Sequence, residues 1–246
     1  MIRVTESFVL LHGFGGTHRA WDGVAGCLSR ESYLPLAPDL PGHGEAPDAL
    51  RPITFAGCVA YVLALCPERF ALCGYSMGGR LALHLALAAP ERVERLVLVS
   101  TTAGIEDAVE RARRRSSDAR LAAELEAMPL GEFAERWRSQ PLFAEDPPEV
   151  NALAREDLCR NRGDALAATL RGIGTGEMEP LWGRLGELAM PVTVLVGERD
   201  TRFRELGERM VGLLPRATMV VVPGGHDLPR ESPAAVATGV RTLLIS

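Results

Sequence analysis

The chain contains no lysine: all 27 of its basic residues are arginine. It also lacks an excess of positive charge, because 32 acidic residues bring the formal net charge to −5 at pH 7. A protein with this balance has no overall basic field to attract a polyanion. We therefore expect no nucleic-acid partner.

Long hydrophobic runs and cysteine motifs are missing as well. The apolar stretches are too short to cross a bilayer, which argues against membrane insertion. Residues 1–6 carry a charge pair and do not resemble a secretory signal. The five cysteines lie mostly in apolar segments without C-x-x-C spacing, which favours buried free thiols over disulfides or a zinc site. We expect a cytoplasmic protein with no metal and no cofactor.

What is present is an alternation of short apolar runs with helical patterns, typical of βαβ units and a mostly parallel sheet. The predicted strands are residues 8–11, 33–37, 70–73, 96–100, 192–196 and 219–222. The predicted helices around them are 21–28, 54–65 with Thr54 as N-cap, 80–89 and 232–244. From 101 to about 186 the pattern is instead helical and charged, interrupted by proline and glycine. The prediction is an α/β core of residues 1–100 and 187–246, with residues 101–186 inserted as a helical lid over the strand ends.

The most informative stretch is Gly74-Tyr75-Ser76-Met77-Gly78, which follows an apolar run and opens a helical one. This strand–turn–helix context is the one that a nucleophile elbow requires. The turn is so tight that the flanking positions have almost no room for a side chain, hence the glycines. The pattern predicts that Ser76 is a reactive serine.

A serine hydroxyl is a poor nucleophile and a poor base, so Ser76 needs an imidazole to take its proton and an acid to orient that imidazole. In this architecture the acid and then the histidine follow the serine along the chain. Asp200 ends one strand segment and His226 follows the last strand, so their side chains can meet above Ser76. Glu198 is an alternative acid, but it falls earlier on the strand exit. Asp227 is a weaker alternative, because adjacent loop residues rarely hydrogen-bond through their side chains.

The other histidines have less specific settings. His84 lies on the helix after the elbow, where we expect a partly buried residue with satisfied hydrogen bonds. His12 and His43 lie in glycine-containing turns, where structural and functional roles are both open. His18 is expected to be exposed to solvent.

Negative charge that develops on a substrate oxygen needs backbone N–H groups aimed at it. One donor is expected from Met77, directly after the serine. The other is expected from Phe14, in the glycine-rich loop of residues 12–16 after the first strand. A plain turn is the alternative for that loop, since its motif is short. The sequence thus predicts an oxyanion hole formed by Phe14 and Met77.

Further segments carry a resemblance that covers nearly the whole chain. The elbow continues as Gly79-Arg80, and the insert contains Arg114 with Ser117-Asp118, then Trp137-Arg138-Ser139-Gln140-Pro141 and Leu170-Arg171-Gly172-Ile173-Gly174-Thr175-Gly176. The late strand closes with Gly197-Glu198-Arg199-Asp200, followed by Phe203. With these segments the chain resembles the 2-succinyl-6-hydroxy-2,4-cyclohexadiene-1-carboxylate (SHCHC) synthase family, lyases of menaquinone biosynthesis with the α/β-hydrolase fold.

The resemblance implies an elimination and no hydrolysis. Family members remove a ring proton from 2-succinyl-5-enolpyruvyl-6-hydroxy-3-cyclohexene-1-carboxylate and expel its enolpyruvyl group as pyruvate. Ser76, activated by His226 and Asp200, would be the base, and the enolate oxygen would lie in the oxyanion hole. The substrate-binding residues that the resemblance implies are Tyr75, Arg80, Arg114 and Trp137. Arginine suits this small anionic tricarboxylate because a guanidinium holds a carboxylate in a fork geometry that lysine cannot reproduce.

The chain departs from the family pattern at two places. Members usually have another substrate arginine in the lid, at a position that holds Leu158 here, so we assign that role to Arg160, two residues later. After the last strand, Leu228-Pro229 stands where a histidine is common. This second departure leaves the predicted triad intact.

Two other functions stay open on the residues alone. A serine carboxylesterase or small-molecule hydrolase would use the same groups through an acyl-enzyme on Ser76. A non-catalytic scaffold protein could also keep the fold. Lyase and esterase share the serine, the histidine and the oxyanion hole, so the motifs do not separate them. Nor does the sequence distinguish a monomer from a homo-oligomer.

Overall fold

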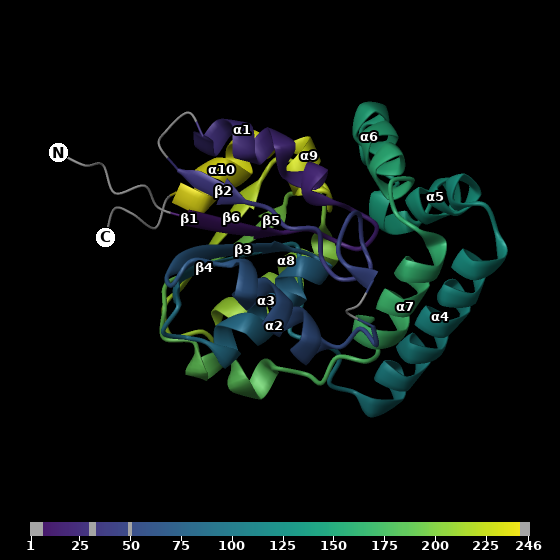
Figure 1. Cartoon of the computed structure of the whole chain (residues 1–246). Helices are drawn as coiled ribbons and strands as arrows, with labels where there is room; N and C mark the ends of the chain where they lie inside the picture. The colour runs from purple at the N-terminus through teal and green to yellow at the C-terminus, as the bar shows by residue number, and fades with distance from the viewer. Residues whose placement is uncertain (1–6, 30–32, 49–50, 242–246) are drawn as a thin grey trace.

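The computed structural model describes residues 7–29, 33–48 and 51–241, and these contain a six-stranded, parallel sheet (Figure 1). Its strands are β1 (Ser7–Leu11), β2 (Leu34–Leu36), β3 (Phe70–Tyr75), β4 (Val93–Val99), β5 (Val192–Gly197) and β6 (Ala217–Val222). They run in the order β2-β1-β3-β4-β5-β6. The order reverses direction between β1 and β3. In open α/β sheets ligands bind at the carboxyl ends of the strands, at such a switch point.

Helices cover both faces of the sheet (Figure 1). One face carries η1 (His18–Trp21), α1 (Asp22–Ser29), α9 (Leu228–Glu231) and α10 (Pro233–Arg241). The other face carries α2 (Phe55–Leu65), α3 (Met77–Ala88), η4 (Trp182–Glu187) and α8 (Thr201–Val211).

The residues of β1 show why this arrangement needs continuous apolar strands. Val9 and Leu11 pack into the hydrophobic cluster on the α3 side, whereas Phe8 and Leu10 pack into the cluster on the α1 side. Successive strand residues point to opposite faces, so a strand that is covered on both sides has no polar face. The α/β class and the parallel sheet predicted from this pattern are confirmed.

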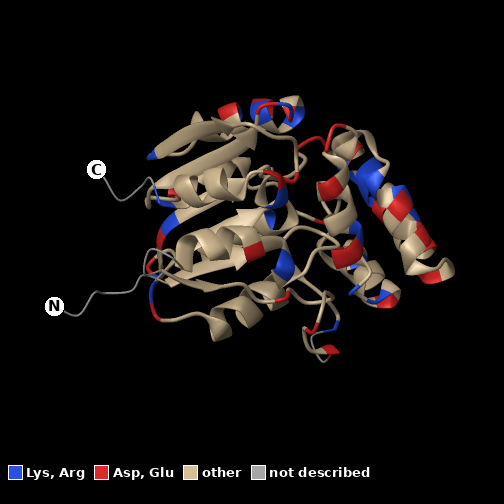
Figure 2. Ribbon diagram, turned by 90° about the horizontal axis from the view of Figure 1, so that it is seen from above, with Lys and Arg blue, Asp and Glu red and all other residues tan. Residues whose placement is uncertain are grey.

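The segment between β4 and β5 is helical, as predicted. Its elements are α4 (Ala108–Ala127), α5 (Leu130–Arg138), η3 (Pro141–Phe143), α6 (Pro148–Leu158) and α7 (Gly163–Ile173). They stand to one side of the sheet, with α4 packed on α7 and α5 on α6 (Figure 1). An apolar cluster that includes Leu125, Phe133 and Leu166 holds them together. Figure 2 shows arginine and acidic residues interspersed along these helices. Their function as a lid stays a prediction.

Several boundaries differ from the predicted ones. Helix α3 begins at Met77, directly after Ser76, and not at residue 80. Strand β4 begins at Val93 and not at residue 96. The sequence pattern does not predict α8, because that helix is highly polar and buries only Gly207 and Met210. The predicted final helix corresponds to α10, and the short helix α9 directly before it is not predicted.

Other predictions have mixed outcomes. The Thr54 side chain accepts a hydrogen bond from Gly57 N at 3.0 Å, which confirms it as the N-cap of α2. All five cysteines are free, as predicted, but only Cys58 and Cys73 are buried. Cys27 and Cys66 are partly buried, and Cys159, the C-cap of α6, is exposed. The predictions for residues 1–6 and 242–244 lie outside the described residues. No helix within the described ranges is long and apolar enough to cross a membrane.

Candidate active site

Ser76 lies on the sharp turn between β3 and α3. Its backbone has φ 51° and ψ −108°, a conformation that is strained for a residue with a side chain. The Ser76 N–H donates to Val99 O at 2.9 Å, and its carbonyl accepts from Thr101 Oγ1 at 2.7 Å. These bonds hold the strained turn in place.

Two glycines make this turn sterically possible. A Cβ atom at Gly74 would lie 2.3 Å from Gly78 O, and one at Gly78 would lie 2.1 Å from Leu11 O. Both distances are well inside van der Waals contact with backbone, which cannot move aside. The structure therefore gives the physical reason for the glycine on each side of Ser76.

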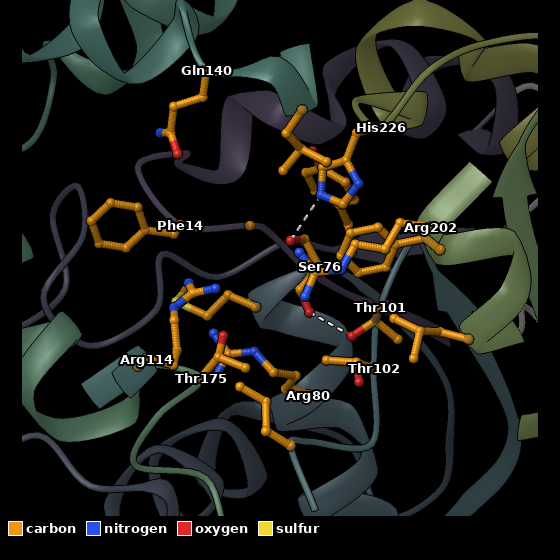
Figure 3. Close-up of a pocket in the computed structure, with 18 of the residues that line it drawn as sticks. Phe14, Ser76, Arg80, Thr101, Thr102, Arg114, Gln140, Thr175, Arg202 and His226 are labelled. Atoms are coloured by element: carbon orange, nitrogen blue, oxygen red, sulfur yellow. Dashed lines mark hydrogen bonds between the residues drawn. The ribbon is translucent and has the colours of Figure 1, made fainter. Parts of the chain in front are cut away.

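His226 connects Ser76 to Asp200. The Ser76 Oγ atom lies 3.1 Å from His226 Nε2 (Figure 3). Asp200 Oδ2 lies 2.7 Å from His226 Nδ1. A carboxylate can only accept, so Nδ1 carries the proton and Nε2 is free to accept from the serine hydroxyl. His226 and Asp200 are buried, whereas Ser76 lines the cavity. This arrangement can draw a proton through Ser76 for base or nucleophilic chemistry.

The two alternative acids lie elsewhere. Glu198 is exposed at the end of β5. Asp227 is buried, but its carboxylate lies 3.3 Å from the guanidinium of Arg138 and 3.1 Å from that of Arg230. Asp200 is thus the carboxylate that contacts the ring of His226.

Two buried histidines brace the loop after β1. His12 Nε2 accepts from Leu40 N at 3.0 Å, and His43 Nε2 accepts from Gly15 N at 3.2 Å. Burial lowers the pKa of both imidazoles, that of His43 to about 3, so each is a neutral acceptor at pH 7. Of the two roles left open by the sequence, the structure supports the structural one, which is to position the loop that carries Phe14.

The remaining two histidines are outside this group. His84 stacks on Phe55 with ring centroids 4.2 Å apart. Its Nε2 is buried and, among the described residues, has no hydrogen-bond partner, so the expected full satisfaction is absent. His18 is half-exposed and its Nδ1 lies 3.0 Å from Asp39 Oδ1.

Phe14 and Met77 both line the cavity beside Ser76. Met77 is the first residue of α3, and N–H groups in the first turn of a helix have no acceptor within that helix. The same end of α3 carries the positive pole of the helix dipole. The surroundings of Ser76 can therefore stabilise an oxygen that gains negative charge.

The cavity above Ser76 has a volume of about 640 Å³, in the range of small-molecule sites. Residues of both the core and the insert line it (Figure 3). The core supplies, among others, Phe14, Tyr75, Ser76, Met77, Arg80, Thr101, Thr102, Arg202, Phe203, Glu205 and His226. The insert supplies, among others, Arg114, Trp137, Gln140, Phe143, Thr169, Ile173 and Thr175.

Arg80 and Arg114 reach this cavity from opposite parts of the fold. Arg80, in the first turn of α3, is buried and donates to Ile173 O at 2.7 Å. Arg114, on α4, donates through Nε to Asp118 Oδ1 at 2.7 Å. Burial, and then the charge of Arg114, lower the pKa of Arg80 to about 10, so it stays cationic at pH 7. Only Arg114 is paired with a carboxylate, which leaves this wall of the cavity positively charged and suited to an anion.

The aromatic residues implied by the resemblance are also at the cavity. Trp137 packs against Phe14 with ring centroids 5.0 Å apart, and Tyr75 lies 5.4 Å from the ring of His226. Burial, and then the charge of Asp227, raise the pKa of Tyr75 well above its usual value. Its hydroxyl therefore stays protonated and can donate a hydrogen bond.

Arg160 is not part of this group, and the prediction that placed it there is wrong. Its side chain is exposed beyond the end of α6 and pairs with Glu156. It lines a separate surface hollow with Arg19. Leu158, two residues earlier, faces inward against Gly15. Leu158 is the last residue of α6, whereas Arg160 lies in the turn after it, so Arg160 does not take the place of that inward-facing residue.

Sequence reasoning missed several polar residues of the cavity, among them Gln140 and Arg202. Gln140 belongs to the W-x-x-Q-P segment but has no predicted role, although it lines the cavity. Arg202 also lines it, in the first turn of α8. The signal that could have found Arg202 is its place two residues after Asp200, at the same strand end.

A second group of charges lies between the insert and the core. Arg138 pairs with Asp146 and with Asp227, while Arg230 pairs with Asp227 and with Asp157. We call these five residues the buried charge cluster, because no member's side chain is more than 9% exposed. Its residues come from α5, α6, α9 and the adjoining loops, so it joins the insert to the loop that carries His226.

Comparison with known proteins places this site in a family. The pattern of the family described as "Alpha/beta hydrolase family" matches residues 8–238. A putative SHCHC synthase of Bacillus subtilis (strain 168) is 33% identical over 98% of this chain and 91% of its own length. The SHCHC synthase of Salmonella newport (strain SL254) is also 33% identical, over 98% of this chain and 94% of its own length.

Solved structures agree. The structure of MenH from S. aureus is 29% identical and superposes with a TM-score of 0.92 over 97% of this chain and 93% of its own. A thermophilic esterase from Thermogutta terrifontis, with malate bound, is 26% identical and has a TM-score of 0.84 over 97% of this chain and 89% of its own. The chain is an α/β-hydrolase-fold enzyme that belongs to the SHCHC synthase family.

Proposed function

We propose that the protein catalyses the elimination of pyruvate from 2-succinyl-5-enolpyruvyl-6-hydroxy-3-cyclohexene-1-carboxylate, a step of menaquinone biosynthesis that yields SHCHC. The observation that carries the proposal is the pairing of the Ser76–His226–Asp200 arrangement with two guanidiniums in one cavity. Membership of the SHCHC synthase family supports the same reaction.

The proposed first step is removal of a ring proton by Ser76. The serine oxygen takes the proton from the carbon α to the succinyl carbonyl while its own proton passes to His226 Nε2, 3.1 Å away. Asp200 holds the opposite ring nitrogen and stabilises the imidazolium that forms. The electron pair of the broken C–H bond moves into the carbonyl and forms an enolate.

The proposed oxyanion hole then stabilises that enolate. The N–H groups of Met77 and Phe14 donate to its oxygen, and the positive end of α3 adds to the field. Collapse of the enolate breaks the bond between the ring and the enolpyruvyl oxygen. The departing oxygen takes a proton that His226 can return, and the enol product becomes pyruvate.

Substrate binding is assigned to residues around this centre. Arg80 and Arg114 bind a carboxylate of the substrate at one wall of the cavity. Asp118 compensates the charge of Arg114, and the charge of Arg80 stays uncompensated. Trp137 and Tyr75 contact the ring and its hydroxyl. These four side chains together orient the α-proton towards Ser76, since contacts far from the reacting atom can position the substrate.

Ester hydrolysis is the second candidate. The turn at Ser76 has the strained geometry of a nucleophile, and the 26% identical esterase has the same fold. In that reaction Ser76 attacks an ester carbonyl and forms an acyl-enzyme, which water then cleaves.

The two functions are separated by one pair of assays on the purified protein. With the enolpyruvyl substrate, we expect release of pyruvate and no change in the intact mass of the enzyme during turnover. With p-nitrophenyl esters, we expect slow hydrolysis at most. A burst of p-nitrophenol, an acyl adduct on Ser76 and no pyruvate would instead establish the esterase.

A further inference from the structure

Arg202 lines the cavity, and the proposed mechanism assigns it no role. It lies in the first turn of α8, lines the cavity and is exposed, which places it at the mouth. In Figure 3 it lies beside Ser76 and His226, while Arg80 and Arg114 lie on the other side of Ser76. The cavity therefore has cationic groups at both of its ends.

Arg202 also lacks the counterion that most arginines here have. In the part of the chain that the structure describes, it makes no ion pair and no hydrogen bond within the protein. Glu205, one turn further along α8, lines the same cavity but does not pair with it. Arg204 and Arg209, on the same helix, bond instead to Glu198 O and to Glu106. The guanidinium of Arg202 is thus free to bind a ligand.

The proposed substrate offers a matching group. It carries three carboxylates, and the wall formed by Arg80 and Arg114 lies at one end of the cavity. Arg160, which the sequence analysis assigned to substrate binding, does not line this cavity. A carboxylate at the mouth would otherwise face Glu205 without any cation beside it.

We propose that Arg202 is a further substrate-binding residue, which holds the carboxylate at the opposite end of the substrate from the Arg80–Arg114 wall. This inference rests on the proposed function, because it takes the tricarboxylate as the ligand. An exposed guanidinium binds a carboxylate through charge and up to two hydrogen bonds. Arg202 therefore contributes to the binding of substrate, and the geometry of Ser76, His226 and Asp200 does not depend on it.

The test is steady-state kinetics of pyruvate release by Arg202→Ala. We expect KM to rise about tenfold, as for the loss of a hydrogen bond to a charged group, while kcat changes by less than about twofold. Arg202→Lys should recover only part of the loss, since it keeps the positive charge but not the fork geometry. Arg216→Ala is the matched control: it removes an exposed arginine that does not line the cavity, and should leave KM unchanged.

The outcomes separate the inference from the function on which it rests. If the wild-type protein releases pyruvate and Arg202→Ala has the wild-type KM, the role of Arg202 is refuted while the function stands. A lower kcat at unchanged KM also refutes it, because it would show that Arg202 acts by supporting the neighbouring Asp200. No pyruvate from the wild-type protein refutes both. Fold-changes in KM that multiply when Arg202→Ala is combined with Arg114→Ala, as expected for additive binding free energies, support two independent carboxylate sites.

Discussion

Two groups of arginines flank His226, and they differ in what they are paired with. In the buried charge cluster, Arg138 and Arg230 each contact two carboxylates and have little capacity left for a ligand. In the cavity, Arg80 has only a backbone carbonyl and Arg114 a single carboxylate. The residue type is the same, so the difference lies in the partners.

The comparison teaches how to interpret arginine in a chain that has no lysine. A buried ion pair with complete partners is expensive to break but contributes little net stability against an apolar replacement. Its value here is geometric, since it joins α5 and α6 to the loop of His226. A guanidinium with unused donors beside a cavity is instead a site for an anion. Function follows the missing counterion and not the number of arginines.

The largest effect on activity is expected at His226. His226→Ala should lower kcat by on the order of 10³-fold or more, because histidine and serine act as one unit. The measurement is pyruvate release under saturating substrate. A variant that keeps a tenth of the wild-type kcat would show that the imidazole is not part of the proton path.

Breaking the buried charge cluster should mainly affect stability. Arg138→Met leaves Asp146 and Asp227 buried without one of their cations, which should lower the free energy of unfolding by about 3–5 kcal/mol. Denaturant unfolding measures the change. The control is Arg155→Met, which breaks the exposed pair with Glu135 and should cost less than about 1 kcal/mol. Equal losses in the two variants would contradict the distinction between the cluster and ordinary surface pairs.

Removing a cavity arginine should mainly affect binding. Arg114→Ala should raise KM by roughly thirtyfold, or about 2 kcal/mol. Arg113→Ala removes the same charge from the neighbouring position, which is exposed and does not line the cavity. Its KM should stay at the wild-type value. A similar rise in both variants would mean that the effect is long-range attraction and not a contact.

A further expected effect is a pH dependence of the free energy of unfolding that originates in the cluster. Burial, only partly offset by Arg138 and reinforced by the charges of Asp227 and Glu231, raises the pKa of Asp146 from 3.8 to about 6. The folded state then holds this proton more tightly than the unfolded state, so the free energy of unfolding falls as pH rises from about 4 to 6. Asp146→Asn keeps the shape and removes the titration. Its unfolding free energy should vary less with pH over this window, and an unchanged slope would contradict the assignment.

Much of the core could be predicted because its signals are local. The apolar run before Ser76, the glycines around it and the helix after it all lie within one segment, and the strand ends locate Asp200 and His226. Helix α8 was missed because its buried side is made by Gly207 and Met210, too few apolar residues to give a periodic signal. The assignment of Arg160 to the cavity is wrong because α6 ends at Leu158, and only the structure shows that Arg160 lies in the exposed turn beyond it. The buried charge cluster joins residues up to 89 positions apart, so no spacing rule predicts it.

The proposed role of Ser76 as the base for elimination is tested most directly by a single-turnover experiment with the enolpyruvyl substrate. Wild-type enzyme in excess should convert it stoichiometrically to pyruvate, and Ser76→Ala should do so on the order of 10³-fold more slowly or worse. Wild-type enzyme that forms no pyruvate, or a Ser76→Ala variant that forms it at the wild-type rate, would contradict the account.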